Sequence, residues 1–187
     1  MPLLKIPLFP PVTPDDSDGR LALAACSDPS AFSELYQRWV AVVYRYFYHR
    51  TRYQAAAEDL TSQLFLAVYQ ALPRYQHRGH FAAWLFTIAG NLFNQYLRQS
   101  RRELPLHEDL PLPSPSDPLA EAINLDEIRR LQVLVKDLPE REQELIRLRY
   151  VAALSFADIA RVLNKREDTV KKSLYRLQAR LQSLLEQ

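Results

Sequence analysis

The chain has 187 residues, a formal net charge of +2 and 48% hydrophobic residues, a composition typical of a soluble globular protein with one or two domains. It contains only 3 glycines, whereas tight β-hairpins, P-loops and Rossmann loops need glycine at positive φ. A β-rich fold and both nucleotide-binding loops are therefore not expected. The single cysteine, Cys26, excludes an internal disulfide and a cysteine-based zinc finger, and it fits a reducing compartment.

No export signal or membrane span is predicted. Pro7, Pro10 and Pro11 interrupt the apolar N-terminal stretch, where a signal peptide would need an unbroken run. The longest uncharged segment, residues 79–97, contains polar residues and keeps its apolar residues on one stripe, which predicts a buried amphipathic helix. We expect a cytoplasmic protein without membrane insertion.

Proline divides the chain into four predicted parts. Residues 1–19 and residues 103–118 are both rich in proline, and such segments do not pack as helices. The predicted parts are a proline-rich N-terminal extension over 1–19, a domain over 20–102, an acidic proline-rich linker over 103–122 and a second domain over 123–187. Each domain is small and needs well-packed helices to be stable.

Both domains are predicted to be all-α, because their apolar residues recur at helical spacing. In the first domain Asp28-Pro29 is a helix start, with an N-cap acceptor followed by proline at the first helical position. A capping box at Ser155–Asp158 opens a helix in the second domain. The further helices are expected over 54–72 and 80–100 in the first domain, and over 120–137, 140–150 and 167–185 in the second.

A basic and aromatic segment lies between Asp59 and Glu103, where no acidic residue occurs. Arginines interleaved with aromatic rings suit melted DNA, because guanidinium groups hold phosphates while rings and pockets take unstacked bases. The alternative is that most of these rings belong to the core, which we favour for Trp84, Phe86 and Tyr96. The functional candidates in the loop before the third helix are Tyr75, Arg78 and His80, with Arg74 just before them.

A second basic stretch, residues 161–180, follows the pattern of a helix-turn-helix: a short capped helix, a four-residue break and a longer basic amphipathic helix. The second helix would lie in a major groove. A basic solvated helix without DNA remains the alternative. The residues predicted to face DNA are Arg166, Thr169, Lys172, Ser173 and Arg176, and Lys171 is a further candidate for phosphate contact.

Catalytic and metal-binding patterns are weak. His77 and His80 have zinc-ligand spacing, but no third ligand completes a site. The acidic pair Glu58-Asp59 lies in a predicted helix without signs of a pocket. We predict no enzymatic activity, no cofactor and no metal site.

With these residues identified, the chain resembles an extracytoplasmic-function (group IV, sigma-24-like) sigma factor of bacterial RNA polymerase. The first domain is similar to sigma region 2 through the segments DPSAFSELYQRWVAVVYRYF, AEDLTSQLFLAVYQAL and FAAWLFTIAGNLFNQYLRQSRR. The second domain is similar to sigma region 4 through LPEREQELIRLRYVAALSFADIARVLNKREDTVKKSLYRLQARLQSLL. The motifs occur in the family's order, joined by a variable linker.

The resemblance implies a helical bundle and a helix-turn-helix that together join core RNA polymerase at its clamp and flap and direct it to promoter DNA. Region 2 would bind and help melt the −10 element, and region 4 would read the −35 element. An anti-sigma factor is an implied further partner. The resemblance adds Asn91, Gln95 and Arg98 to the −10 surface, and it assigns polymerase binding to Glu58, Asp59, Gln63 and Phe65.

The chain departs from the family pattern at several positions. Ser62-Gln63 replaces a common Gln-Glu pair, Gln95 replaces a frequent Asp, and Gly90 should weaken its helix by about 1 kcal/mol relative to alanine. Asn164-Lys165-Arg166 replaces Gly-Ile-Ser in the turn, where Asn can adopt the left-handed conformation.

These departures keep other functions open beside that of a sigma factor. One alternative is a sigma-like decoy that binds an anti-sigma factor without supporting transcription. Another is a stand-alone helix-turn-helix regulator, which would leave the region 2 motifs unexplained.

Overall fold

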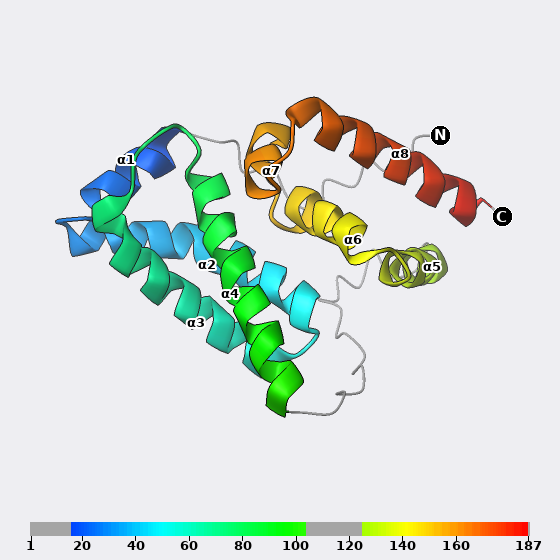
Figure 1. Ribbon diagram of the computed structural model, residues 1–187, viewed down its shortest axis with the longest axis horizontal. Coiled ribbons are helices and arrows are strands. Elements are labelled where there is room, and N and C mark those ends of the chain that lie inside the picture. Colours follow the sequence, from blue (N-terminus) through cyan, green and yellow to red (C-terminus); the bar gives the residue numbers. More distant parts are fainter. Residues whose placement is uncertain (1–15, 104–124, 187) are drawn as a thin grey trace.

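The computed structural model describes residues 16–103 and 125–186, and within these ranges every regular element is a helix (Figure 1). The all-α prediction is confirmed. The first domain holds α1 (Asp16–Ala24), α2 (Pro29–Thr51), α3 (Gln54–Ala71), a 3₁₀ turn at Leu72–Arg74 and α4 (Phe81–Glu103). The second holds α5 (Leu125–Lys136), α6 (Glu140–Ile146), a π-helical turn at Arg147–Val151, α7 (Phe156–Val162) and α8 (Glu167–Leu185).

The predicted start of α2 is confirmed. The carboxylate of Asp28 accepts hydrogen bonds from the backbone N–H of Ser30 at 2.8 Å and from its hydroxyl at 2.7 Å, and Pro29 occupies the first turn. This cap satisfies backbone donors that the first helical turn leaves unpaired. The helix ends at Thr51, and the C-cap residue Arg52 has a left-handed φ of 57°.

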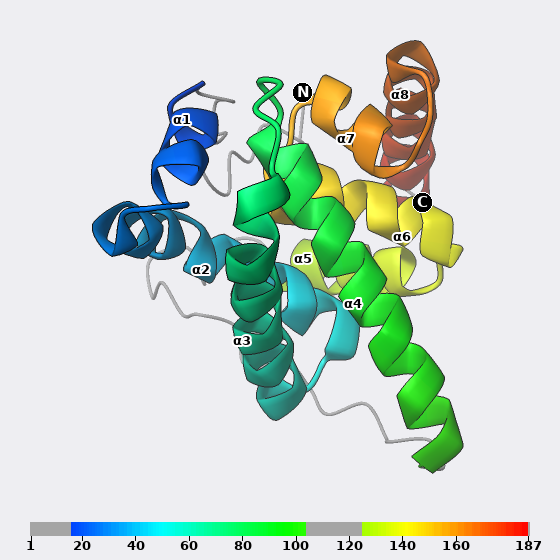
Figure 2. The ribbon, with the colours of Figure 1, turned by 60° about the vertical axis from the view of Figure 1, so that its left-hand side comes forward.

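Helices α2, α3 and α4 enclose an aromatic core (Figure 2). The indole of Trp39 lies 5.9 Å from the ring of Phe81 and 6.2 Å from that of Phe86, and Tyr46 meets Phe86 edge to face at 5.0 Å. Phe86 is fully buried, as predicted. Trp84 and Tyr96, also predicted in the core, are only half-buried and lie at its edge.

Helix α1 differs from the sequence prediction, which placed residues 16–19 in the N-terminal extension. The helix begins at Asp16 and packs on α2. Asp18 is 4% exposed and forms an ion pair with Arg38 at 2.6 Å, while Ala22 and Ala25 enter the core. The rest of the predicted extension, residues 1–15, and nearly all of the linker, residues 104–122, lie outside the described residues.

The second domain contains the predicted helix-turn-helix. The hydroxyl of Ser155 accepts from the backbone N–H of Asp158 at 3.0 Å, so it caps α7. Asn164 adopts a φ of 50° in the turn that follows, which confirms the left-handed conformation expected there. The expected helix over 140–150 is α-helical only as far as Ile146, because its last turn is π-helical.

The two domains pack against each other (Figures 1 and 2). Helix α4 lies along α7, and α2 lies along the π-helical turn. One continuous cluster of buried apolar residues crosses the boundary and includes Leu148, Leu154 and Ile159 from the second domain. Tertiary packing of this kind was not predicted from the sequence.

Replacing either of two glycines by alanine is expected to change the free energy of unfolding in opposite directions. A Cβ added at Gly90 in α4 meets nothing within 4 Å, so Gly90→Ala should raise the free energy of unfolding by about 1 kcal/mol through helix propensity. A Cβ added at Gly19 in α1 would lie 2.0 Å from Nδ1 of His77, so Gly19→Ala should lower that free energy by about 1–3 kcal/mol. Urea unfolding followed by circular dichroism measures both.

The double variant Gly19→Ala/His77→Ala is the control for the steric explanation. Removing the imidazole should recover most of the loss. A Gly19→Ala chain as stable as the unmodified one would contradict the close approach of α1 to this loop.

Because the pKa of His49, near the end of α2, is lowered in the folded chain, we expect the protein to lose stability in acid. Burial, and then the positive charges of Arg52, Arg147 and Arg45, lower the pKa of His49 from 6.5 to about 4. Between these values the unfolded chain binds a proton that the folded chain does not, so stability is complete above pH 6.5 and is lost as the pH falls toward 4. The loss is at most about 3 kcal/mol, at ~1.4 kcal/mol per pH unit.

The measurement is urea unfolding across this pH range for the unmodified chain and for His49→Gln. Carboxylates titrate in both proteins, so their effect cancels in the difference. The variant should lose less stability on acidification, and parallel curves would contradict the assignment to His49.

Candidate nucleic-acid interface

A loop between α3 and α4 carries most of the residues predicted to meet melted DNA. The 3₁₀ turn at Leu72–Arg74 contains Pro73 and ends where the N–H of Tyr75 donates to the carbonyl of Leu72 at 2.9 Å. Gly79 has a φ of 69°, a conformation that favours glycine, and α4 begins two residues later. The loop therefore turns sharply and places Arg78 and His80 on either side of Gly79.

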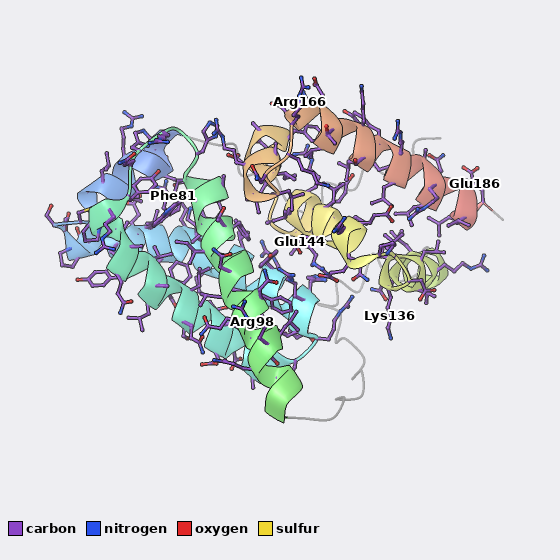
Figure 3. All side chains as sticks on the ribbon, viewed as in Figure 1. Phe81, Arg98, Lys136, Glu144, Arg166 and Glu186 are labelled. Atoms are coloured by element: carbon purple, nitrogen blue, oxygen red, sulfur yellow. The ribbon has the colours of Figure 1, made fainter. Side chains whose placement is uncertain are left out.

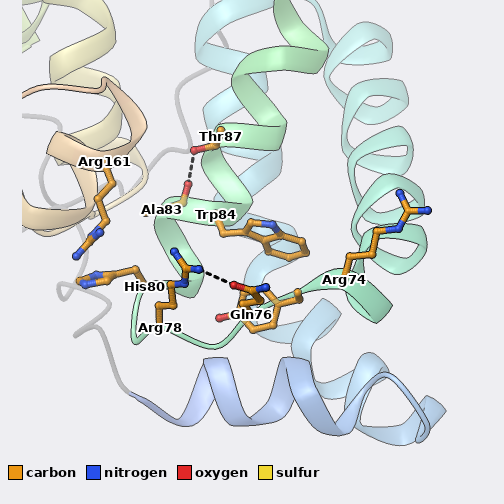
Figure 4. Close-up of a pocket in the computed structure, with 9 residues that line it drawn as sticks. Arg74, Gln76, Arg78, His80, Ala83, Trp84, Thr87 and Arg161 are labelled. Carbon is orange, nitrogen blue, oxygen red and sulfur yellow. Dashed lines mark hydrogen bonds between the residues drawn. The ribbon is translucent and has the colours of Figure 1, made fainter.

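The loop and the first turns of α4 form a pocket of about 390 Å³ (Figure 4). The rings of Tyr75 and Trp84 lie 4.7 Å apart in its wall, and the guanidinium of Arg78 is held by Gln76 at 2.5 Å. Aromatic walls beside guanidinium groups suit an unstacked base and its phosphates. The lining residues are Arg74, Tyr75, Gln76, Arg78, His80, Ala83, Trp84, Thr87 and Arg161.

The structure brings the four predicted loop residues, Arg74, Tyr75, Arg78 and His80, to this pocket. Tyr75 is only 8% exposed, so it forms wall rather than a free stacking platform. The sequence interpretation missed Trp84, which it placed in the core. It also missed Arg161, because no sequence pattern shows that α7 approaches this loop.

The other three residues assigned to this surface continue it along α4. Asn91, Gln95 and Arg98 are exposed, and their spacing places them on one helical face that extends the line of Trp84 and Thr87. Figure 3 locates Arg98 near the far end of this helix.

His80 makes a contact with the second domain. Its Nδ1 lies 3.0 Å from Oδ1 of Asp158, a carboxylate that is 2% exposed and also accepts from the hydroxyl of Ser155 at 2.5 Å. One side of the pocket is therefore bordered by α7, which begins the helix-turn-helix.

Five of the six residues predicted to face duplex DNA are exposed on α8 or at its N-cap. They are Arg166, Thr169, Lys172, Ser173 and Arg176. Lys171 is intermediate in exposure; its ammonium pairs with Glu167 at 2.7 Å and lies 5.7 Å from the ring centre of Phe156. The Glu167 carboxylate raises the pKa of Lys171, and this pairing makes its charge less available to phosphate. The apolar residues of α8, among them Leu174 and Leu177, point into the domain.

The predicted polymerase-binding residues on α3 divide into two groups. Glu58, Asp59 and Gln63 are exposed, and the amide of Gln63 donates to Asp59 at 2.7 Å. Phe65 does not fit the prediction as a surface contact, because it is 5% exposed and its ring packs 4.6 Å from that of Tyr36. Its neighbours Leu66 and Tyr69 are instead 59% and 53% exposed.

No cluster of three or more potential metal ligands occurs among the described residues. Within the same ranges, no helix is long and apolar enough to cross a membrane.

Comparison with known proteins matches each domain to one family. The chain matches Sigma-70 region 2 over residues 35–103 and Sigma-70 region 4 over residues 128–181. It is 35% identical to the ECF RNA polymerase sigma factor BldN of Streptomyces coelicolor over 87% of this chain, a match that spans 63% of BldN. It is 30% identical to the ECF RNA polymerase sigma factor SigD of Mycobacterium tuberculosis, over 88% of this chain and 81% of SigD.

The chain also shares its fold with a solved structure. The structure of CnrH in complex with the cytosolic domain of CnrY superposes with a TM-score of 0.63 at 24% identity, covering 92% of this chain and 98% of the other.

Proposed function

Because the chain belongs to the ECF RNA polymerase sigma factors, we propose that it binds core RNA polymerase and directs it to a dedicated set of promoters. The observation that carries this proposal is the pairing of two different DNA-facing surfaces on one chain. The first domain has an aromatic and basic pocket suited to an unstacked base. The second has an exposed basic helix, α8, which follows the turn of the helix-turn-helix.

We propose that the first domain recognises the −10 element and helps to melt it. A base of the non-template strand would enter the pocket beside Trp84, while Arg74 and Arg78 hold its phosphates. Extruding a base costs a few kcal/mol of stacking, and a preformed aromatic wall offsets part of that cost. The polar stripe of Asn91, Gln95 and Arg98 would then hold the neighbouring single strand.

We propose that α8 reads the −35 duplex from the major groove. Its side chains at the N-cap and in the first turns, Arg166, Thr169 and Ser173, are placed to reach base edges. Lys172 and Arg176 supply phosphate contacts, which fix the register of the helix without reading sequence. Lys171 contributes less to phosphate binding, because it is already paired with Glu167.

The polymerase contact is proposed on α3 and on the second domain. Exposed carboxylates at Glu58 and Asp59 lie beside the exposed apolar side chains Leu66 and Tyr69, a combination typical of a protein interface. We place the clamp on this face, with Phe65 supporting it from within, and the flap on the second domain. Binding to polymerase in turn implies a cytoplasmic location.

An anti-sigma factor that covers these faces is part of the same proposal. The alternative of a decoy without transcriptional activity drew its support from the departures in the turn and on α3. Asn164 adopts the left-handed conformation that the turn needs, so the change at this position does not favour a decoy. Arg166 stands at the N-cap of α8 without a side-chain cap hydrogen bond, so the support for a decoy now rests on Lys165, Arg166 and the departures on α3.

The decisive test of the proposed function is in vitro transcription with bacterial core RNA polymerase, this chain and a genomic promoter library. Transcript starts that share paired elements near −10 and −35 are expected. Arg78→Ala should reduce open-complex formation while core binding is kept, because it removes a pocket cation and leaves the α3 side chains proposed to contact polymerase unchanged. Starts that are absent, with polymerase binding also absent, would favour the decoy.

The salt dependence of duplex binding tests the role of α8. If Lys172 contacts a phosphate, Lys172→Ala should lower the slope of log affinity against log salt by about 1 and weaken binding to all sequences. Lys171→Ala should change the slope less, because Glu167 already pairs with Lys171. Lys172→Arg is the control that keeps the charge. Equal slopes for Lys172→Ala and the unmodified chain would show that this face of α8 does not meet the duplex.

A further inference from the structure

Helix α1 lies against the loop that carries the pocket residues (Figure 4). The match to Sigma-70 region 2 begins at residue 35, so α1, at Asp16–Ala24, precedes that match. None of the residues predicted to meet DNA lies on α1. The helix is short, and it packs on both α2 and α4, the helices that enclose the core beneath the pocket.

Two small residues let α1 and the turn after it approach the loop closely. Gly19 is buried, and a Cβ added there would lie 2.0 Å from Nδ1 and 2.1 Å from Cε1 of His77, so the imidazole occupies the place of a side chain. The thiol of Cys26 donates to the carbonyl of Leu72 at 3.3 Å. Gly19, Ala22 and Cys26 are spaced three and four residues apart, which places them on one helical face. That face therefore contacts both the start and the middle of the loop.

The residues held by α1 adjoin the wall of the pocket. The ring of His77 lies 6.5 Å from that of Tyr75. Tyr75 in turn lies 4.7 Å from Trp84 and 5.9 Å from Phe81, ring centre to ring centre. Arg78, a cation of the pocket, directly follows His77 in the sequence. A displacement of His77 would therefore move both the aromatic wall and this cation.

A buried ion pair anchors α1 on α2. The carboxylate of Asp18 is 6% exposed and accepts from the guanidinium of Arg38 at 2.6 Å. The same guanidinium donates to the hydroxyl of Ser17 at 3.1 Å. It also pairs with Glu34, which lies one turn away on α2 and is 57% exposed. Loss of Arg38 would leave a buried carboxylate without this cation, which is costly, whereas an exposed pair such as that with Glu34 contributes little.

We propose that α1 is a positioning element of the pocket. Anchored through Asp18 and Arg38, it holds His77 and Leu72 so that the loop keeps the arrangement that receives an unstacked base. A loop that is ordered beforehand loses less freedom when DNA binds, so α1 strengthens base capture without touching DNA. The consequence for DNA rests on the proposed function, whereas the support of the loop by α1 does not.

The support is tested by ¹⁵N relaxation of the backbone amides in the full chain, measured at residues 75–80. Asp18→Ala and Arg38→Ala break the anchoring pair from either side. The control is Glu34→Ala, which removes the exposed partner of the same arginine and leaves its pair with Asp18 intact. Amides of α2 and α3 serve as the internal reference, because a general loss of stability would not loosen one loop selectively.

Order parameters of about 0.85, the value of rigid backbone, are expected in the loop of the unmodified chain and of Glu34→Ala. They should fall below about 0.6 in Asp18→Ala and Arg38→Ala, while those of α2 and α3 stay unchanged. Gly19→Ala, which displaces His77 but keeps the ion pair, should lower the same values. A loop that is already flexible in the unmodified chain, or that stays rigid in all three test variants, would overturn the support by α1.

Binding of a mixed-sequence single-stranded oligodeoxynucleotide to the same full-length proteins tests the consequence for DNA. If the loosened loop holds the receiving arrangement for one-tenth of the time, the apparent affinity falls roughly tenfold. Such a loss is expected for Asp18→Ala and not for Glu34→Ala. Both variants lose one negative charge, a change that by itself favours DNA binding, so a loss of affinity confined to Asp18→Ala reports the loop.

The outcomes separate this role of α1 from the proposed function. A loosened loop with unchanged affinity would overturn the part of α1 in DNA binding. An unmodified chain that does not bind the oligodeoxynucleotide would count against the pocket as a DNA site, while the order parameters still decide whether α1 holds the loop.

Discussion

The structure depends on one helix, α4, which contributes one face to the core and the opposite face to the candidate site. Its inner face carries Phe81, Leu85, Phe86, Ala89 and Phe93, which close the core against α2 and α3. Its outer face carries Trp84, Thr87, Asn91, Gln95 and Arg98. Since both sets belong to one rigid helix, the edge-to-face packing of Phe86 on Tyr46 also fixes where the pocket and the polar stripe lie. The site is therefore positioned by the core rather than by the loop alone.

The same constraint explains which parts of the site could be predicted from the sequence. Helices with a clear apolar stripe, and caps such as Asp28 and Ser155, are set by nearest neighbours along the chain, and the structure has them where they were expected. Exposed positions on α8 follow from the same periodicity. Trp84 was misjudged because a half-buried aromatic at the edge of a core has the same spacing as one inside it. Phe65 was misjudged because a family role was carried over to a ring whose helical phase points inward.

The features that could not be predicted from the sequence come from contacts between segments that lie far apart along the chain. Nothing in the spacing of Asp18 and Arg38, or of Gly19 and His77, indicates that α1 docks against α2 and the loop before α4. The prolines near the N-terminus instead suggested an extension without helices as far as residue 19. Likewise, Tyr46 and Glu144 are 98 residues apart, and no local pattern predicts a buried hydrogen bond between them. Periodicity reports which face of a helix is buried but not what covers it.

Buried polar groups and apolar side chains share the interface between the two domains. Apolar surface would join two domains firmly, and exposing it on separation would favour aggregation. The interface combines the buried polar side chains of Tyr46, Arg50 and Glu144 with an apolar contact through Leu148 and Leu154. In the proposed function, two weak recognition modules on one linker gain from each other only when a third molecule holds them at the promoter spacing.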